Sequence, residues 1–455
     1  MHILSKSTYI KGLQCEKALY MTKKHPYLRD KLSITQRAIF KRGTDVGILA
    51  QQRYPGGVNM SPSSPTLFPK KVQETMENLN NPDINVMYEA VFQYNDTLVM
   101  VDILVRDGDQ WKAIEVKSSL KPSPTYYNDA ALQYYVLHGS GVMLSDFQLM
   151  HLNGNFVKEG PIDVEKLFVN VSVLDYAKEK EAEIASNVEH LKEVVAQPHA
   201  PLVNIGVHCH LPYTCDFLGH CWKMVPNNSF LYTTALPDEQ LFECYFGGFG
   251  TNQRLLERLD PEDEEAKQIE ALENNTYYID YKTLFALAPN PKPRHVAYLN
   301  MLCDNPAVPE LDGKRPYQEM PLAFVVSGDQ EPEGYSVWHC FDDHSRSQEA
   351  LQLIHEKLTQ YDLVVSFAPM NHSFQPKLIN LYGTLIDAHF YHPKIKNGIN
   401  LQNIAKALFH EDNLFEHSRI LVEASETEST SYEQAINDLI TENEMIKRIY
   451  QHFFH

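Results

Sequence analysis

Two apolar runs separated by a turn signal form the most regular pattern in the chain. Residues 98–105 and 111–116 flank Asp107-Gly108, a dipeptide that suits the positive φ angles of a tight hairpin turn. A two-residue turn at this point would pair Asp102 with Ala113. The pattern therefore predicts a β-hairpin.

The predicted hairpin gathers charged side chains on one of its faces. Because side chains alternate along a strand, Glu115 and Lys117 share the face of Asp102, with Glu115 diagonally across from it. Ile114 and Val116 point the other way, into the core. Two carboxylates and a lysine are thus expected to lie within reach of one shared ion.

Helical and strand periodicities surround this hairpin, in the alternation that is typical of an α/β domain. In chain order, the pattern predicts a helix over 3–24 capped by Ser5 or Ser7, a pair of helices over 33–55 interrupted at Gly43, a helix over 127–138, a strand over 141–152, and a long amphipathic helical region over 163–197.

Two carboxylates that converge on one point repel each other unless a cation lies between them. Hard oxygen ligands with room for water suit Mg²⁺ or Mn²⁺. Lys117 would add a positive charge beside that ion, and the set could activate a water and neutralise the charge that develops on a phosphodiester. A surface hairpin whose charged side chains are merely solvated fits the same three residues.

Glu89, which ends the apolar stretch before the hairpin, and Gln133, in the helix-like segment after it, extend the pattern. In this order the chain resembles the RecB-like branch of the PD-(D/E)xK nucleases. That branch often has a histidine in its first helical motif, where this chain has only residues 42–47, RGTDVG, and this departure favours a ligand role for Glu89. The resemblance implies Asp102, Glu115 and Glu89 as metal ligands, Lys117 as the residue that positions or activates water, and Gln133 as one that orients substrate or lysine.

Three cysteines, Cys209, Cys215 and Cys221, follow one another at equal spacing among prolines and glycines that keep the backbone irregular. They can close around one metal centre but need a fourth ligand. This arrangement resembles the iron–sulfur nucleases of the RecB-like branch, including the CRISPR-associated adaptation nucleases, which implies Cys15 as that ligand and a [4Fe–4S] cluster. A structural zinc site completed by a nearby histidine is the competing interpretation.

Composition limits the setting of this chemistry. The 455-residue chain has a net charge of −19, yet residues 1–53 hold eleven lysines and arginines against three acidic residues. A local basic surface of this kind can hold a phosphate backbone. There is no apolar run long enough to span a membrane and no signal-peptide pattern, so we expect a cytoplasmic protein with no membrane partner.

The last part of the chain carries a second strand-rich pattern. Residues 291–455 resemble the ribonuclease H-like, DnaQ-type module that follows RecB-like domains in some bacterial proteins. The segment 315–326 is expected to be a loop. Exonuclease activity in such modules rests on Asp-x-Glu in the first strand, but this chain has Asn300 and Leu302 there. Neither can replace an anionic metal ligand, so we expect an inactive domain.

The sequence thus predicts an α/β protein with a restriction-endonuclease-like core over 1–225, an acidic helical linker over 226–290, and a ribonuclease H-like domain over 291–455. We expect a metal-dependent DNA nuclease in repair, recombination, CRISPR or phage defence. Tyr126-Tyr127 could stack unpaired bases of single-stranded ends, or could simply be buried. A non-catalytic nucleic-acid-binding scaffold within a larger defence or repair complex is the first alternative, and a redox protein that uses the cluster is the second.

Overall fold

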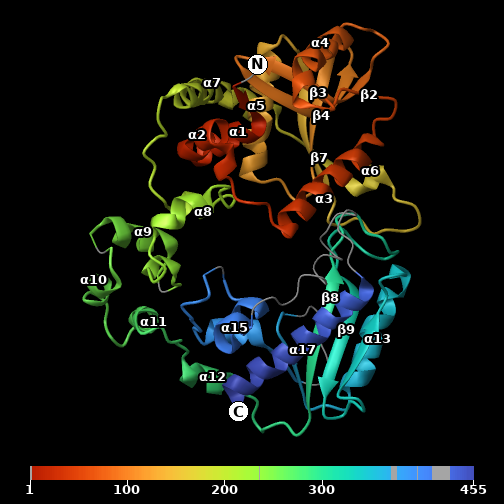
Figure 1. The fold of residues 1–455 in the computed structure, drawn as a ribbon. Helices are drawn as coiled ribbons and strands as arrows, with labels where there is room; N and C mark the ends of the chain where they lie inside the picture. Colours follow the sequence, from red (N-terminus) through yellow and green to blue (C-terminus); the bar gives the residue numbers. More distant parts are fainter. Residues whose placement is uncertain (1–2, 235, 249, 370–376, 397, 412–430) are drawn as a thin grey trace. The chain divides into compact units, whose positions relative to one another are not determined.

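The computed structural model describes residues 3–234, 236–248, 250–369, 377–396, 398–411 and 431–455. It is a mixed α/β structure with two mixed β-sheets (Figure 1). The chain divides into two compact units. The first comprises residues 1–222 together with 306–318, and the second comprises residues 223–305 and 319–455.

The first unit is built on a seven-stranded sheet in the order β2-β3-β4-β5-β6-β7, with β1 pairing parallel to β4 at one end. Strands β3, β4 and β5 form an antiparallel meander, and β6 runs parallel to β5. The strands are β1 (Leu4–Ser5), β2 (Val58–Asn59), β3 (Val86–Tyr94), β4 (Thr97–Asp107), β5 (Gln110–Lys117), β6 (Leu144–Leu152) and β7 (Phe168–Ser172).

Helices pack on both faces of this sheet and bury its apolar side chains. One core includes Leu104 and Ala113 of the hairpin with Leu132 of α5 and Leu191 of α7. The opposite core joins Ile103 and Ile114 to α3. The helices are α1 (Lys6–Gln14), α2 (Glu16–Lys24), α3 (Ile34–Gln51), α4 (Phe68–Leu79), α5 (Pro124–Gly139), α6 (Val164–Leu167), α7 (Leu174–Ala196) and α8 (Leu218–Cys221).

Three predicted elements differ in the structure. The helix expected over 3–24 is divided at Cys15, whose extended backbone ends α1 and begins α2, while Ser5 caps α1 as expected. The pair of helices expected over 33–55 is one helix, because α3 continues through Gly43. The helical region expected over 163–197 contains β7, because residues 168–172 pair with β6 and complete the sheet.

The second unit contains a five-stranded sheet in the order β10-β9-β8-β11-β12. Strand β9 runs antiparallel to both β8 and β10, whereas β8, β11 and β12 are parallel. The strands are β8 (Val296–Asp304), β9 (Met320–Gly328), β10 (Tyr335–His339), β11 (Leu363–Ser366) and β12 (Lys377–Asn380). The loop expected over 315–326 was therefore wrong in its second half, which belongs to the buried strand β9 between β10 and β8.

Short helices precede this sheet and longer ones pack on it. They are α9 (Asp238–Phe246), α10 (Asn252–Leu256), α11 (Glu264–Glu273), α12 (Tyr281–Leu287), α13 (Ser347–Leu358), α14 (Leu381–Asp387), α15 (Leu401–Phe409) and α17 (Tyr432–Phe454). Helix α13 packs against β8 and β9 in one core, and α17 closes the other face with Ile446 and Tyr450. In the described residues, no helix is long and apolar enough to cross a membrane.

Residues 306–318 belong to the first unit although they lie between β8 and β9 in sequence. Ala307 is buried in the core beside Ile114. The Lys158 ammonium pairs with Asp312 at 2.5 Å, and the Tyr317 hydroxyl donates to the Ser118 carbonyl oxygen. These contacts fasten the segment next to the end of β5.

Candidate functional site

The β4–β5 hairpin turns one residue later than the sequence analysis assumed. Asp107 pairs with Gln110, and Leu104 rather than Asp102 pairs with Ala113. The predicted pairing of Asp102 was therefore wrong by two positions, which leaves each side chain on its expected face because the side-chain period is two. In this register Asp102 comes level with Glu115.

The two strands separate at this level, and a side chain replaces the backbone ladder. The last registered pair is Ile103 with Ile114. Beyond it, the Val116 N–H donates to Asp102 Oδ2 at 2.6 Å instead of to a strand carbonyl. The opening lets Asp102 and Glu115 lie near each other between the strands.

Glu115 is the most enclosed charged group of the site, since only 2% of its side chain is exposed. Its Oε1 accepts a hydrogen bond from the Lys117 ammonium at 2.8 Å. Its Oε2 accepts one from Gln133 Nε2 at 2.7 Å. Buried Gln133 on α5 thus holds this carboxylate, and its own Oε1 is buried without a hydrogen-bond partner.

Two further charged residues, which the sequence analysis missed, complete the cluster. The Lys6 ammonium, at the start of α1, donates to Glu115 Oε1 at 2.5 Å. Asp129 accepts from the Lys117 ammonium at 2.7 Å. Asp129 lies four residues before Gln133 on α5, and this helical spacing was a usable signal. The two-residue strand β1 that positions Lys6 is too short to show any pattern.

Glu89 occupies a strained place on β3. Its φ is +53°, a left-handed conformation that side chains other than glycine rarely adopt within a strand. Glu89 has no paired residue in the register between β3 and β4. The residue pairs on either side of it place it opposite Asp102. The strain therefore falls next to the other two carboxylates.

The environment shifts the pKa values of the two central carboxylates, Asp102 and Glu115, in opposite directions. Burial, together with the negative charge of Glu115, raises the pKa of Asp102 to about 8. Burial also opposes ionisation of Glu115, but Lys117 and Lys6 outweigh it and hold the pKa of Glu115 below its ordinary range. Burial and Glu115 likewise raise the pKa of Glu89. The site has more acidic groups than its lysines can neutralise.

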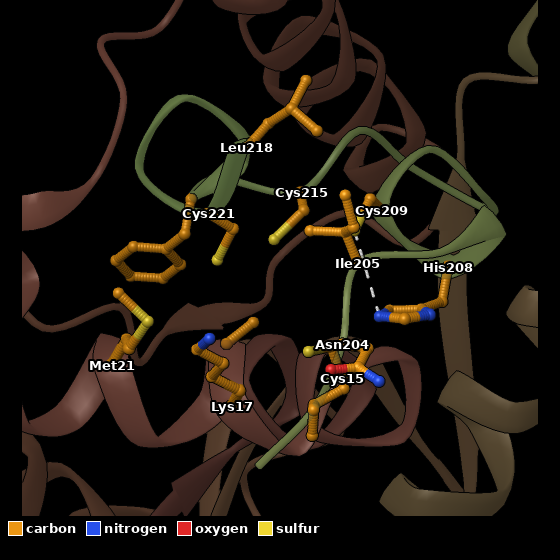
Figure 2. Close-up of a pocket in the computed structure, with 13 residues that line it drawn as sticks. Cys15, Lys17, Met21, Asn204, Ile205, His208, Cys209, Cys215, Leu218 and Cys221 are labelled. Carbon is orange, nitrogen blue, oxygen red and sulfur yellow. Dashed lines mark hydrogen bonds between the residues drawn. The ribbon is translucent and has the colours of Figure 1, made fainter. Parts of the chain in front are cut away.

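The four cysteines singled out in the sequence line one cavity (Figure 2). Cys209 is buried, while Cys15, Cys215 and Cys221 are partly exposed. Figure 2 shows Cys215 and Cys221 reaching into this space from the α8 segment and Cys15 from the α1–α2 junction, with His208 at its edge. Burial raises the pKa of the thiols of Cys15, Cys215 and Cys221, the second to about 11.

The cysteine-bearing loop is tied to α1 by polar contacts. Gln14 Nε2 donates to the carbonyl oxygens of His208 and Tyr213, both at 2.7 Å. The Lys11 ammonium pairs with Asp216. Lys17 of α2 also lines the cavity, where its charge lowers the pKa of Cys221 against the effect of burial. The break at Cys15 thus turns its thiol towards a loop far away in sequence.

Other candidate residues occupy mixed environments. Tyr126 and Tyr127 are both partly buried against the core, and the Lys117 ammonium lies 4.8 Å from the centre of the Tyr126 ring. In the second unit, the Asn300 amide donates to Glu442 on α17 at 2.8 Å.

Among the residues that the structure describes, no three His, Cys, Asp or Glu side chains converge tightly enough, as placed, to hold one metal ion. The chain matches no model of a known protein family, and no curated protein is significantly similar to it in sequence.

Proposed function

We propose that the protein is a divalent-metal-dependent DNA nuclease of the RecB-like PD-(D/E)xK type. The observation that carries the proposal is the cluster that Asp102 and Lys117 form around the buried Glu115 carboxylate, joined by the strained Glu89. Strained backbone and shifted carboxylate pKa values gather at functional sites because a fold keeps them only where they serve a purpose.

The topology around this cluster supports the proposal. An antiparallel meander, a helix and a parallel strand, here β3-β4-β5-α5-β6, form the core expected of PD-(D/E)xK nucleases. The acidic residues lie where the two central strands separate. Lys6 and Lys117 supply positive charge for a phosphate.

Asp102 and Glu115 would hold a Mg²⁺ or Mn²⁺ ion, with Glu89 assisting directly or through water. A bound ion would polarise the phosphodiester and lower the pKa of a nearby water. Gln133 and Lys117 fix the orientation of Glu115, and Asp129 keeps the Lys117 ammonium beside that carboxylate. Lys117 is then placed to orient the attacking water and to stabilise charge on the phosphate.

The cysteine cavity supports a second proposal, a [4Fe–4S] cluster held by Cys15, Cys209, Cys215 and Cys221. Four thiols from two distant segments line one cavity, and a cluster of this type takes four thiolates. Lys17 would offset part of their negative charge. His208 lines the same cavity, so a zinc site with three cysteines and this histidine is the outcome that the metal analysis must distinguish.

The part of the chain over 291–455, whose sheet lies in the second unit, is proposed to be a ribonuclease H-like domain without catalytic activity. Its strand order, with β9 running against its neighbours, agrees with that fold. Asn300 occupies the position of the first metal ligand and bonds to Glu442. A neutral amide can satisfy a carboxylate directly, whereas two acids facing each other would need a cation. This unit could bind nucleic acid, or protein partners of a repair or defence complex.

The test is cleavage of end-labelled single-stranded and double-stranded DNA with Mn²⁺ or Mg²⁺. Wild type should cut, and Glu115→Gln and Lys117→Ala should each lower the rate by about a hundredfold or more, because each removes a group that acts on the reacting atoms. Lys112→Ala is the matched control, since Lys112 lies on β5 but on the face of the strand opposite to Glu115 and Lys117. Equal cleavage by wild type and all variants would refute the proposal.

A further inference from the structure

Lys6 lies in the place that a cation should occupy among the acidic residues. Its ammonium is 2.5 Å from Glu115 Oε1, the same oxygen that Lys117 contacts at 2.8 Å. Asp102 and Glu89 also attract it electrostatically. One positive charge therefore attracts all three carboxylates that are proposed to hold the divalent ion.

The two lysines of the site differ in how firmly they are held. Lys117 is 15% exposed and is fixed by Asp129 as well as by Glu115. Lys6 is 28% exposed, and its one ion pair among the described residues is the contact with Glu115. A lysine has a flexible four-carbon stem and a compact charge. Lys6 can thus leave Glu115 by turning its side chain, while Lys117 cannot do so without losing Asp129.

The start of α1 keeps this mobile charge close to the site. Leu4 and Ser5 pair with Thr97 and Leu98 on β4, the strand that carries Asp102. Ser5 caps the helix and accepts a hydrogen bond from the Thr8 N–H. The backbone of Lys6 is therefore anchored on both sides, and only its side chain has freedom to move.

We propose that Lys6 and a divalent cation compete for Glu115, and that Lys6, once displaced, binds the phosphate of the substrate. The inference rests on the proposed nuclease function. In the metal-free state, Lys6 offsets the repulsion among Asp102, Glu115 and Glu89. When an ion takes over that role, the ammonium has no carboxylate left to neutralise, and a phosphodiester is the anion that comes next to it.

This proposal predicts opposite changes in metal affinity and in rate. Lys6→Met removes the competing charge, so Mn²⁺ should bind about tenfold more tightly, because the ion no longer has to break a charge-assisted contact to Glu115. The cleavage rate at saturating Mn²⁺ should fall about tenfold or more, because a phosphate-binding charge is lost. A residue that only supported the fold would weaken both.

Mn²⁺ binding is measured on the full chain without DNA, by titration calorimetry and by electron paramagnetic resonance of free Mn²⁺. Lys6→Arg, which keeps the charge, should restore most of the rate. Lys178→Met, which removes an exposed lysine on α7, should change neither quantity. Unchanged or weaker Mn²⁺ binding by Lys6→Met would overturn the proposal.

A measurement on the wild type does not depend on any variant folding. Saturating Mn²⁺ should increase acylation of the Lys6 amine severalfold, as followed by peptide mass spectrometry, because a released ammonium loses its buried acceptor. Labelling of Lys178 should stay constant. If Mn²⁺ binds through Glu115 but the labelling of Lys6 does not rise, the displacement of Lys6 is wrong. If Glu115→Gln binds Mn²⁺ like the wild type, the proposed metal site itself fails.

Discussion

Asp102 and Glu115 form a pair that works against the stability of the fold. Glu115 is buried and Asp102 is partly buried. The only hydrogen bond that Asp102 accepts among the described contacts comes from the Val116 N–H, whereas Glu115 is held by two lysines and a glutamine. The free energy of unfolding therefore depends on which of the two carries a proton. Functional sites commonly reduce stability in this way.

The raised pKa of Asp102 predicts a pH-dependent gain on removing its charge. A carboxyl group whose pKa rises on folding contributes stability that is fully present only below the ordinary aspartate pKa of 3.8 and is lost progressively until the pH reaches about 8. Asp102→Asn should thus raise Tm at both pH values, by clearly less at pH 5.5 than at pH 8.5, where we expect a rise of roughly 5 °C. Thermal melts are run with EDTA so that no divalent ion neutralises the wild-type pair.

Asp109→Asn, in the exposed hairpin turn, is the control for the change in net charge. Its melting temperature should follow the wild type at both pH values. Equal shifts for Asp102→Asn at pH 5.5 and pH 8.5 would show that repulsion between the carboxylates does not limit stability.

Glu89 allows its backbone strain to be measured separately from its charge. Both Glu89→Gly and Glu89→Ala remove the carboxylate, but only glycine adopts φ +53° without cost. Glu89→Gly should therefore be more stable than Glu89→Ala by about 1 kcal/mol in urea unfolding. The opposite order would mean that residue 89 relaxes to an ordinary strand conformation when the charge is gone.

At the level of elements, the sequence predicted the local patterns and missed the long-range ones. The face of the β4–β5 hairpin was right because strand alternation is local, and a slip of the register by two residues preserves it. The break at Cys15 was missed because the helical periodicity of residues 3–24 continues across it. Strand β7 was missed because it becomes a strand only by pairing with β6.

For the candidate site, too, the sequence predicted the local contacts and missed the long-range ones. Asp102, Glu115 and Lys117 share one hairpin, so their spacing revealed them. Lys6 reaches Glu115 from a position 109 residues earlier in the sequence, and no local pattern marks that contact. Asp129 could have been found from its helical spacing to Gln133, because both lie on one turn of α5 facing the sheet.

The junction of α1 and α2 carries the prediction about the cofactor. If Cys15 completes a [4Fe–4S] cluster, anaerobically purified protein should be brown and contain about four irons per chain. Cys15→Ala should lower both the iron content and the Tm, because the cluster would join α1 to the loop that bears the other cysteines. Iron analysis and thermal melts measure the two effects.

Cys303→Ala is the control, since Cys303 lies on β8 and does not line the cysteine cavity. It should alter neither iron content nor Tm. Colourless protein with one zinc per chain, unaffected by Cys15→Ala, would favour the site that uses His208.

At the scale of the whole molecule, one segment belongs to the first unit although it lies within the sequence of the second. Residues 306–318 separate β8 from β9, yet Ala307 completes the core behind β5. An acidic side chain at this position would be buried without a partner. Ala307→Asp should therefore destabilise the first unit by about 2–4 kcal/mol.

Hydrogen exchange followed by mass spectrometry locates this effect. Peptides covering β3 to β5 should exchange faster in Ala307→Asp, although the substitution lies in the C-terminal half of the sequence. Ala368→Asp places the same charge at an exposed position of the second unit and should leave those peptides unchanged. Equal exchange in both variants would mean that the first unit does not depend on this segment.

Helix α1 links the carboxylate cluster at its start to the cysteine cavity at its end. Lys6 is its first residue and Cys15 follows its last, so eight helical residues separate Lys6 in the carboxylate cluster from Cys15 in the cysteine cavity. Each helical residue turns the backbone by about 100° and advances it by about 1.5 Å. One alanine inserted between Lys11 and Gly12 would rotate one end away from its partners whenever the other end is seated. Surface loops generally tolerate changes in length at little cost, but the number of residues in α1 is fixed by both of its ends at once.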